Sequence, residues 1–205
     1  MFETLQSLVL ASASPRRREL LQSAGLRFRV VASGVEEIHA GDESPEALVR
    51  RWAKEKAMAV SRGLPESWVL AADTLVILEG RIFGKPADAF EAMELLEQLS
   101  GNTHTVASGV CVMRRGREAV GGVVQTRVRF KPLSRGEIQA YVRTGHPLDK
   151  AGAYGIQGPG AFLVEWIRGS YTNVVGLPLC ETLQWLLDLG VVAPAASPAG
   201  RCCAS

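Results

Sequence analysis

One acidic residue inside the longest apolar stretch of the chain constrains the fold more than any other feature. Asp73 is the only ionisable residue between Trp68 and Leu78, a stretch that predicts a buried strand. A carboxylate in such a strand costs several kcal/mol unless it is paired, hydrogen-bonded or bound to a metal. The structural alternative is an acid at the strand end that caps a neighbouring element. We favour a functional Asp73, because strand ends in α/β sheets open into ligand crevices.

Helical and strand patterns alternate along the chain, which predicts an α/β fold. Strands are expected at residues 8–11, 28–31, 68–78, 81–83, 103–113, 118–130 and 161–167. Helices are expected to begin after the capping residues Ser14, Ser44, Asp88 and Ser134, and a last helix is expected to begin at Pro178. The segments 103–113 and 118–130 form a long hairpin, so the sheet is expected to contain antiparallel pairing.

Length and composition describe one ordinary globular domain. The 205 residues are 47% hydrophobic and 21% charged, with a net charge of +2. This balance excludes a dedicated polycation, so an anion site must be a local cluster. We expect a single domain over 1–192 and a disordered tail over 193–205, because that end has few large apolar residues.

The chain shows no sign of export or membrane insertion. No apolar run reaches the roughly 18 residues of a membrane span, and the residues after Met1 do not resemble a secretory leader. Cys111 and Cys180 lie in apolar segments and Cys202-Cys203 in the tail, with neither disulfide nor zinc-site spacing. We expect a reduced cytoplasmic protein whose cysteines serve as small core residues.

Three arginines crowd the start of the first helix. Arg16, Arg17 and Arg18 follow Ser14-Pro15 at a position where the helix dipole favours acidic groups. Surface arginines are common, so a solvated basic helix start is one interpretation. An anion would reverse the unfavourable electrostatics, and the preceding strand and turn favour a phosphate site.

Further cations and carboxylates occur in separate segments. Lys56 falls on the apolar face of its helix, where it either extends along its neighbours to water or points into a cleft. Lys85 follows a turn and could simply be exposed. Glu36-Glu37 lie in a loop that could equally be solvated, but a second carboxylate beside Asp73 would suit Mg²⁺ or Mn²⁺.

A glycine-rich stretch from Gly152 to Gly160 also carries Tyr154 and Gln157. Glycines permit close backbone approach, a tyrosine can stack on a planar group, and an amide can read a base edge. A flexible loop is the structural alternative. Together with the cations and carboxylates, this inventory predicts a metal-assisted enzyme that acts on a nucleotide polyphosphate.

These motifs together resemble the Maf family of nucleoside triphosphate pyrophosphatases. The resemblance covers residues 5–190 and rests on motifs that occur in the family's order. They are Leu10-Ala11-Ser12-Ala13-Ser14-Pro15-Arg16-Arg17, Val35-Glu36-Glu37, Lys54-Glu55-Lys56-Ala57, Ala72-Asp73-Thr74, Gly84-Lys85-Pro86, Leu99-Ser100-Gly101, Asp149-Lys150-Ala151-Gly152-Ala153-Tyr154-Gly155-Ile156-Gln157-Gly158 and Val175-Gly176-Leu177-Pro178-Leu179.

The resemblance implies an architecture and a reaction. The expected fold is two lobes around a deep cleft on an extended mixed β-sheet, as in Maf and ITPase-like proteins. The expected reaction is hydrolysis of a nucleoside triphosphate to the monophosphate and pyrophosphate with a divalent cation, Mg²⁺ or Mn²⁺. The glycine-rich motif is similar to that of the subfamily acting on dTTP, UTP and some modified pyrimidine nucleotides.

The resemblance also implies roles for nine residues. Asp73 matches the catalytic acidic residue, and Asp73 with Glu37 is the expected metal pair. Substrate contacts are expected from the remaining matched positions, with Arg16, Thr74 and Gln157 as specificity residues: Ser14, Arg16, Arg17, Lys56, Thr74, Lys85 and Gln157.

Two alternative functions stay open at this point. One is a nucleotide- or nucleic-acid-binding regulator of septum formation without turnover. The small net charge and the lack of aromatic residues among the basic ones speak against it, so we expect no stable nucleic-acid partner. The other is the sister specificity for 7-methyl-GTP. A homodimer is expected only because it is the commonest assembly of soluble proteins.

Overall fold

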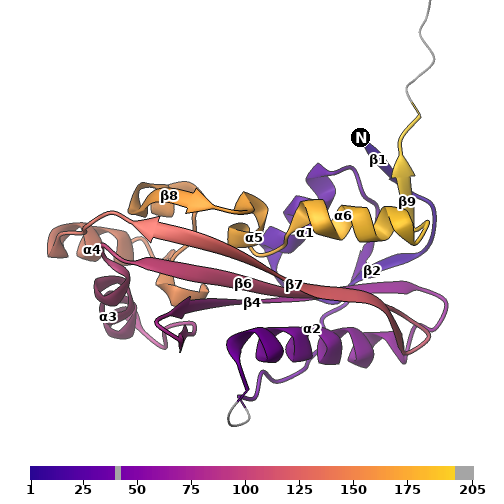
Figure 1. Cartoon of the computed structure of the whole chain (residues 1–205), viewed down its shortest axis with the longest axis horizontal. Coiled ribbons are helices and arrows are strands. Elements are labelled where there is room, and N and C mark those ends of the chain that lie inside the picture. The colour runs from indigo at the N-terminus through magenta and orange to yellow at the C-terminus, as the bar shows by residue number, and fades with distance from the viewer. Residues whose placement is uncertain (40–42, 197–205) are drawn as a thin grey trace, which may run out of the picture.

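The computed structural model describes residues 1–39 and 43–196. A mixed sheet of seven strands organises the chain, in the order β3-β2-β4-β6-β7-β8 with β5 paired to β4, and β1 pairs separately with β9 (Figure 1). The elements, including the 3₁₀ helices η1 and η2, are β1 (Phe2–Thr4), β2 (Leu8–Leu10), α1 (Pro15–Ser23), β3 (Arg29–Val30), α2 (Pro45–Ser61), β4 (Trp68–Leu78), β5 (Arg81–Phe83), α3 (Ala89–Leu99), β6 (Thr103–Arg114), β7 (Arg117–Phe130), α4 (Arg135–Val142), η1 (Ala151–Ala153), η2 (Gly158–Leu163), β8 (Val164–Arg168), α5 (Tyr171–Val175), α6 (Leu179–Asp188) and β9 (Val192–Pro194).

Three long strands form the centre of the sheet. β2 is parallel to β3 and β4, whereas β4, β6, β7 and β8 pair antiparallel in succession. Since β4, β6 and β7 span 11, 12 and 14 residues, they reach from one end of the molecule to the other. The α/β class and the extended mixed sheet are thus confirmed.

Capping side chains set the helix starts where the sequence predicts them. Ser14 and Ser44 each precede a proline and accept a hydrogen bond from a backbone N–H of the first turn. Ser134 forms a complete capping box with Glu137. Asp88 caps α3 through two backbone N–H groups, but Glu91 accepts from Ala87 N, so the predicted capping box there is incomplete.

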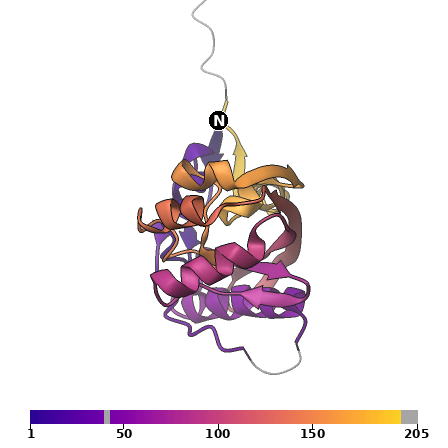
Figure 2. The same ribbon diagram turned by 90° about the vertical axis from the view of Figure 1, so that its left-hand side faces the viewer.

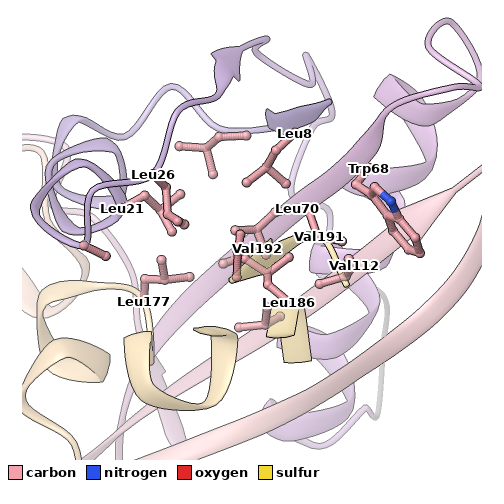
Figure 3. Packing of buried hydrophobic residues seen from close by; sticks show 14 residues of the cluster. Leu8, Leu21, Leu26, Trp68, Leu70, Val112, Leu177, Leu186, Val191 and Val192 are labelled. Atoms are coloured by element: carbon pink, nitrogen blue, oxygen red, sulfur yellow. The ribbon is translucent and has the colours of Figure 1, made fainter. Parts of the chain in front are cut away.

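Two hydrophobic cores on one side of the sheet define two lobes. In the first, Leu21 of α1, Leu186 of α6 and Leu177 of the segment before α6 pack against Leu70 and Val112 of the sheet (Figure 3). The second core brings α3 and α4 onto the other end of the same strands, through residues that include Val76, Val106, Val128 and Phe130. Helix α2 forms a layer on the opposite face (Figure 2). The lobes therefore share β4, β6 and β7.

Two local predictions need correction. The segment predicted as a strand from 161 is a 3₁₀ helix as far as Leu163, since Pro159 lies in its first turn, and the strand begins at Val164. Cys111 is buried as predicted, whereas Cys180 is exposed because the first turn of α6 turns it outward.

The ordered chain continues beyond the predicted domain end at residue 192. Ala193 and Pro194 belong to β9 and pair with Glu3 and Phe2 of β1. Residues 197–205 of the predicted tail lie outside the described residues, and the single-domain assignment stays a prediction. Among the residues that the structure describes, no helix combines the length and apolarity needed to cross a bilayer.

Candidate functional site

A cleft of about 950 Å³ lies where the two lobes meet on the sheet. Its walls come from the N-terminus of α1, the loop before α2, the middle of β4 and the glycine-rich segment around η1. All nine residues singled out in the sequence line this one cleft: Ser14, Arg16, Arg17, Glu37, Lys56, Asp73, Thr74, Lys85 and Gln157. The deep cleft between two lobes is confirmed, whereas the individual roles of these residues stay predictions.

Asp73, Lys56 and Glu37 form a charged cluster on the floor of the cleft. Lys56 Nζ lies 2.6 Å from Asp73 Oδ2 and 2.6 Å from Glu37 Oε1. Lys56 and Asp73 are 8% and 5% exposed, so this ion pair is shielded from water. The second Asp73 oxygen, Oδ1, accepts from the Thr74 backbone N–H at 2.7 Å. The partner that Asp73 needs in its apolar strand is therefore Lys56.

The periodicity of α2 and β4 explains how this cluster forms. Leu48, Trp52 and Lys56 share one row of α2 and are all buried. Along β4, Asp73 points toward α2, whereas Thr74 points to the opposite face and meets Arg17 of α1. Two consecutive residues of β4 thus contact charged side chains on opposite faces of the sheet.

Glu37 is the more exposed carboxylate of the cluster. Burial raises its pKa, but the hydrogen bond from Lys56 and the charges of Lys56, Lys85 and Arg17 outweigh this effect and lower it below the usual value. Glu37 therefore stays ionised at neutral pH and adds a second negative charge beside Asp73.

Arg17 is held in place by three neutral oxygens. Its Nε donates to Gly176 O at 2.8 Å, and its two terminal nitrogens donate to Ser12 Oγ and Thr74 Oγ1, each at 3.2 Å. Burial lowers the pKa of Arg17. Within the described chain Arg17 forms no ion pair with a carboxylate, so its remaining N–H donors suit an anion in the cleft.

Thr74 is already fully hydrogen-bonded. Its hydroxyl accepts from Arg17, donates to Gly176 O at 3.3 Å and lies 2.9 Å from Ser108 Oγ. A hydroxyl has one donor and two acceptor sites, which these neighbours occupy. The specificity role expected of Thr74 stays a prediction, and in the structure its hydroxyl orients Arg17.

Arg16 lies at the cleft entrance and forms an ion pair that the sequence does not reveal. Arg16 Nη1 donates to Asp149 Oδ2 at 3.0 Å, linking the first lobe to the segment before η1. Asp149 also contacts Lys150 Nζ. The pair joins residues 133 positions apart, which no local pattern could indicate. His146 and Trp52 are further cleft residues that the sequence reasoning did not select.

The glycine-rich segment presents Gln157 but withdraws Tyr154. Tyr154 is 5% exposed, its hydroxyl lies 2.7 Å from His104 Nε2, and its ring packs edge-on against Phe130. Tyr154 borders the cleft but is committed to the second core, and its ring is too buried to stack on a ligand in this structure. Gln157 and Lys85 are exposed in the cleft, and neither side chain has a hydrogen-bond partner among the described residues.

The carboxylates fit a divalent ion only in part. No group of three or more His, Cys, Asp or Glu side chains in the described ranges could enclose a metal. Asp73 and Glu37 nevertheless share one cation, Lys56, and so lie close enough to share another. Mg²⁺ commonly takes one or two carboxylates and completes its shell with water and substrate phosphates. The donor set fits an ion that is held jointly with a phosphorylated substrate.

Fold and cleft together define a two-lobed α/β protein with an anion-binding cleft across a mixed sheet. The chain belongs to the Maf family, since the family model for Maf-like proteins matches residues 7–189.

Similar proteins include the dTTP/UTP pyrophosphatase of Myxococcus xanthus (strain DK1622), 52% identical over 187 residues that cover 91% of this chain and 94% of that one. The dTTP/UTP pyrophosphatase of Symbiobacterium thermophilum is 51% identical over 186 residues, covering 91% and 95%. Among solved structures, a HAM1 protein from Coxiella burnetii aligns with 90% of this chain and 100% of that chain, at 18% identity and a TM-score of 0.49.

Proposed function

We propose that this protein is a nucleoside triphosphate pyrophosphatase that hydrolyses dTTP and UTP to the nucleoside monophosphate and pyrophosphate. One observation carries the proposal: a single cleft brings Arg16, Arg17 and Lys85 together with the Asp73–Lys56–Glu37 cluster. Cations that meet carboxylates in this way fit a polyphosphate with its reacting phosphorus toward the acidic side. The relatives named dTTP/UTP pyrophosphatase support the choice of pyrimidine nucleotides.

In the proposed reaction, water attacks the α-phosphorus and the bond to the α,β-bridging oxygen breaks. Asp73 accepts the proton of the attacking water, and pyrophosphate leaves with the bridging oxygen. Lys56 holds Asp73 Oδ2 in place, contacts Glu37 as well, and offsets one of the two carboxylate charges. Arg16, Arg17 and Lys85 neutralise the phosphate chain, helped by the helix start behind Ser14.

A divalent ion, Mg²⁺ or Mn²⁺, is part of the proposal. Asp73 and Glu37 are the residues that would hold it. The ion supplies charge neutralisation for phosphate oxygens and acidifies a bound water. Since the chain provides only two carboxylates, we expect the ion to arrive with the nucleotide. Isothermal titration with Mg²⁺ or Mn²⁺ alone should detect no tight site, whereas titration with a metal-bound, non-hydrolysable dTTP analogue should.

The Asp73→Asn variant tests the catalytic assignment. Asparagine keeps the shape but removes the proton acceptor and a negative charge, so turnover on dTTP should fall at least about 100-fold. The measurement is release of pyrophosphate with Mn²⁺, with and without EDTA, and Asp188→Asn on α6 is the matched control. Near wild-type turnover of Asp73→Asn would overturn the assignment. A folded wild-type protein that binds dTTP without turnover would favour the regulator instead.

Gln157 is proposed to read the base, because its amide is free in the cleft. Replacement by glutamate keeps the length but substitutes an acceptor for the amide donor, which should lower kcat/KM on dTTP and UTP about tenfold or more. The measurement is a nucleotide panel that includes 7-methyl-GTP. An unchanged ratio of dTTP to 7-methyl-GTP hydrolysis would refute base reading.

A cytoplasmic location and a homodimer remain parts of the proposal that rest on sequence expectations alone. Light scattering coupled to size-exclusion chromatography measures the assembly directly.

A further inference from the structure

A second charged surface lies on the sheet, away from the cleft. Four outward-facing side chains of β7 and β8 define it: Arg127, Arg129, Trp166 and Arg168. Their orientation follows from the alternation along each strand, since Val128 and Ile167 between them pack into the second core. We call these four residues the basic sheet face.

The basic sheet face begins where α2 ends. Glu46, in the first turn of α2, accepts a hydrogen bond from Gln125 Nε2 at 2.7 Å and so marks the edge of the helix cover over β7. Arg127 and Arg129 follow on the same face, one and two steps further along the strand. β6 adds Thr103 and Thr105 directly opposite them, and both are partly accessible. Three strands, β6, β7 and β8, thus form an open platform toward the end of the sheet opposite β1 and β9 (Figure 1).

The pairing on this face is electrostatically unfavourable without a partner. Arg127 lies directly opposite Arg168, and like charges at directly opposed positions destabilise a sheet. In the described part of the chain, neither arginine has an ion pair, and Arg129 has only Glu165 at 3.7 Å. Trp166, opposite Arg129, is 41% exposed on this edge strand. The four residues together expose a flat indole among three cations.

We propose that the basic sheet face binds single-stranded nucleic acid. An exposed aromatic ring on a sheet stacks on a base, and arginines around it contact the flanking phosphates. The threonine hydroxyls of β6 offer further donors to the backbone. A second copy of this chain is disfavoured as occupant, because it would bring two sets of arginines together. An acidic protein would satisfy the charges but gives no reason for the exposed indole.

This surface is independent of the proposed pyrophosphatase function. None of its four residues lines the cleft. Sequence reasoning missed it because Arg127 and Trp166 are far apart along the chain and become neighbours only through the β7–β8 pairing. The expectation of no nucleic-acid partner rested on the small net charge and on that apparent separation of basic and aromatic residues.

Fluorescence anisotropy with a labelled single strand of about 12 nucleotides, blocked at both ends, tests the proposal. An excess of a non-hydrolysable dTTP analogue keeps the oligonucleotide out of the cleft. With three phosphate contacts, the logarithm of affinity should fall with the logarithm of salt concentration with a slope of about −2. Binding should also quench the fluorescence of Trp166, a signal that the Trp166→Phe variant identifies by difference.

Two variants separate stacking from charge. Trp166→Ala should weaken binding about tenfold at unchanged salt slope. Arg127→Ala/Arg168→Ala should reduce the slope to about −0.7. The matched control, Arg62→Ala/Arg117→Ala, removes the same charge from exposed positions elsewhere and should bind as wild type. All of these variants should retain dTTP hydrolysis, so a failure here is distinguishable from a failure of the proposed function.

The proposal is overturned by the absence of saturable binding, by an equal loss of affinity in the Arg62→Ala/Arg117→Ala control, or by an affinity that the Trp166→Ala substitution leaves unchanged. If polyglutamate of matched charge competes as well as the oligonucleotide, the face is a site for acidic proteins and the proposal fails.

Discussion

His104 lies beneath the glycine-rich segment and titrates unlike an ordinary histidine. It is 1% exposed, its Nε2 contacts the Tyr154 hydroxyl, and its Nδ1 has no partner in the described structure. Burial lowers the pKa of His104 to about 4 from an ordinary value of 6.5. The imidazole of the folded protein therefore stays neutral above about pH 4.

This shift predicts a loss of stability in acid. Between pH 6.5 and 4 the unfolded chain gains a proton on His104 that the folded chain does not, so the free energy of unfolding falls as pH is lowered. The contribution should reach about 3 kcal/mol. Denaturant titrations from pH 7 to 4 should show a shallower decline for His104→Gln than for wild type, with His39→Gln behaving as wild type. Parallel curves for wild type and His104→Gln would contradict the shift.

At the scale of elements, residues 31–39 ahead of α2 form neither helix nor strand, yet this segment positions Glu37. Two side chains of α2 hold it: Trp52 Nε1 and Arg51 Nη2 both donate to the Ile38 carbonyl, each at 3.1 Å. Glu37 is therefore positioned through its neighbour's backbone. The helix that supplies Lys56 also fixes the carboxylate that Lys56 contacts.

Replacing Trp52 by phenylalanine removes one of these donors and keeps an aromatic ring. If Glu37 helps to hold the metal, the Mn²⁺ concentration that half-activates dTTP hydrolysis should rise about tenfold, as when a ligand's supporting hydrogen bond is lost. Trp185→Phe on α6 is the control for lost aromatic volume, and a denaturant curve measures stability for both variants. An equal metal requirement in the two variants would exclude the positioning role.

Several features of the helices and of the cleft could be predicted from the sequence. Helix starts at Ser14, Ser44 and Ser134 were predictable because capping is a local interaction. The buried position of Lys56 was predictable from the 3.6-residue period of α2. The cleft residues were predictable as a set because of their motifs, not because of their geometry.

Contacts between segments that are far apart along the chain could not be predicted from the sequence. No local sequence pattern indicates that Asp149 forms an ion pair with Arg16 or that Arg17 donates a hydrogen bond to the Thr74 hydroxyl. Tyr154 looked available for stacking because its partner His104 is 50 residues away. The start of β8 was misplaced because the Gly158–Leu163 turn is apolar enough to resemble a strand.

At the scale of the whole molecule, the two lobes have separate cores but common strands. Leu70 and Val112 belong to the first core, and Val76 and Val106 of the same strands belong to the second. The lobes should therefore unfold together in one transition, as a single domain does.

Two cavity variants test this coupling. Leu186→Ala in the first core and Leu96→Ala in the second should each destabilise the protein by about 2–5 kcal/mol. Calorimetry should show one peak for wild type and for both variants, with equal calorimetric and van 't Hoff enthalpies. A second peak, with only one of the two shifted by each substitution, would divide the chain into independent units.

The shared strands also limit how the cleft can close. Closure of two lobes as rigid bodies requires a hinge, a few residues whose backbone angles change. Here the two lobes are joined instead by the continuous strands β4, β6 and β7. Any approach of the two walls therefore requires β4, β6 and β7 to twist or bend together. Because Asp73 and Lys56 are buried at the cleft floor whereas Gln157 is exposed, such a deformation should displace Gln157 more than the buried ion pair.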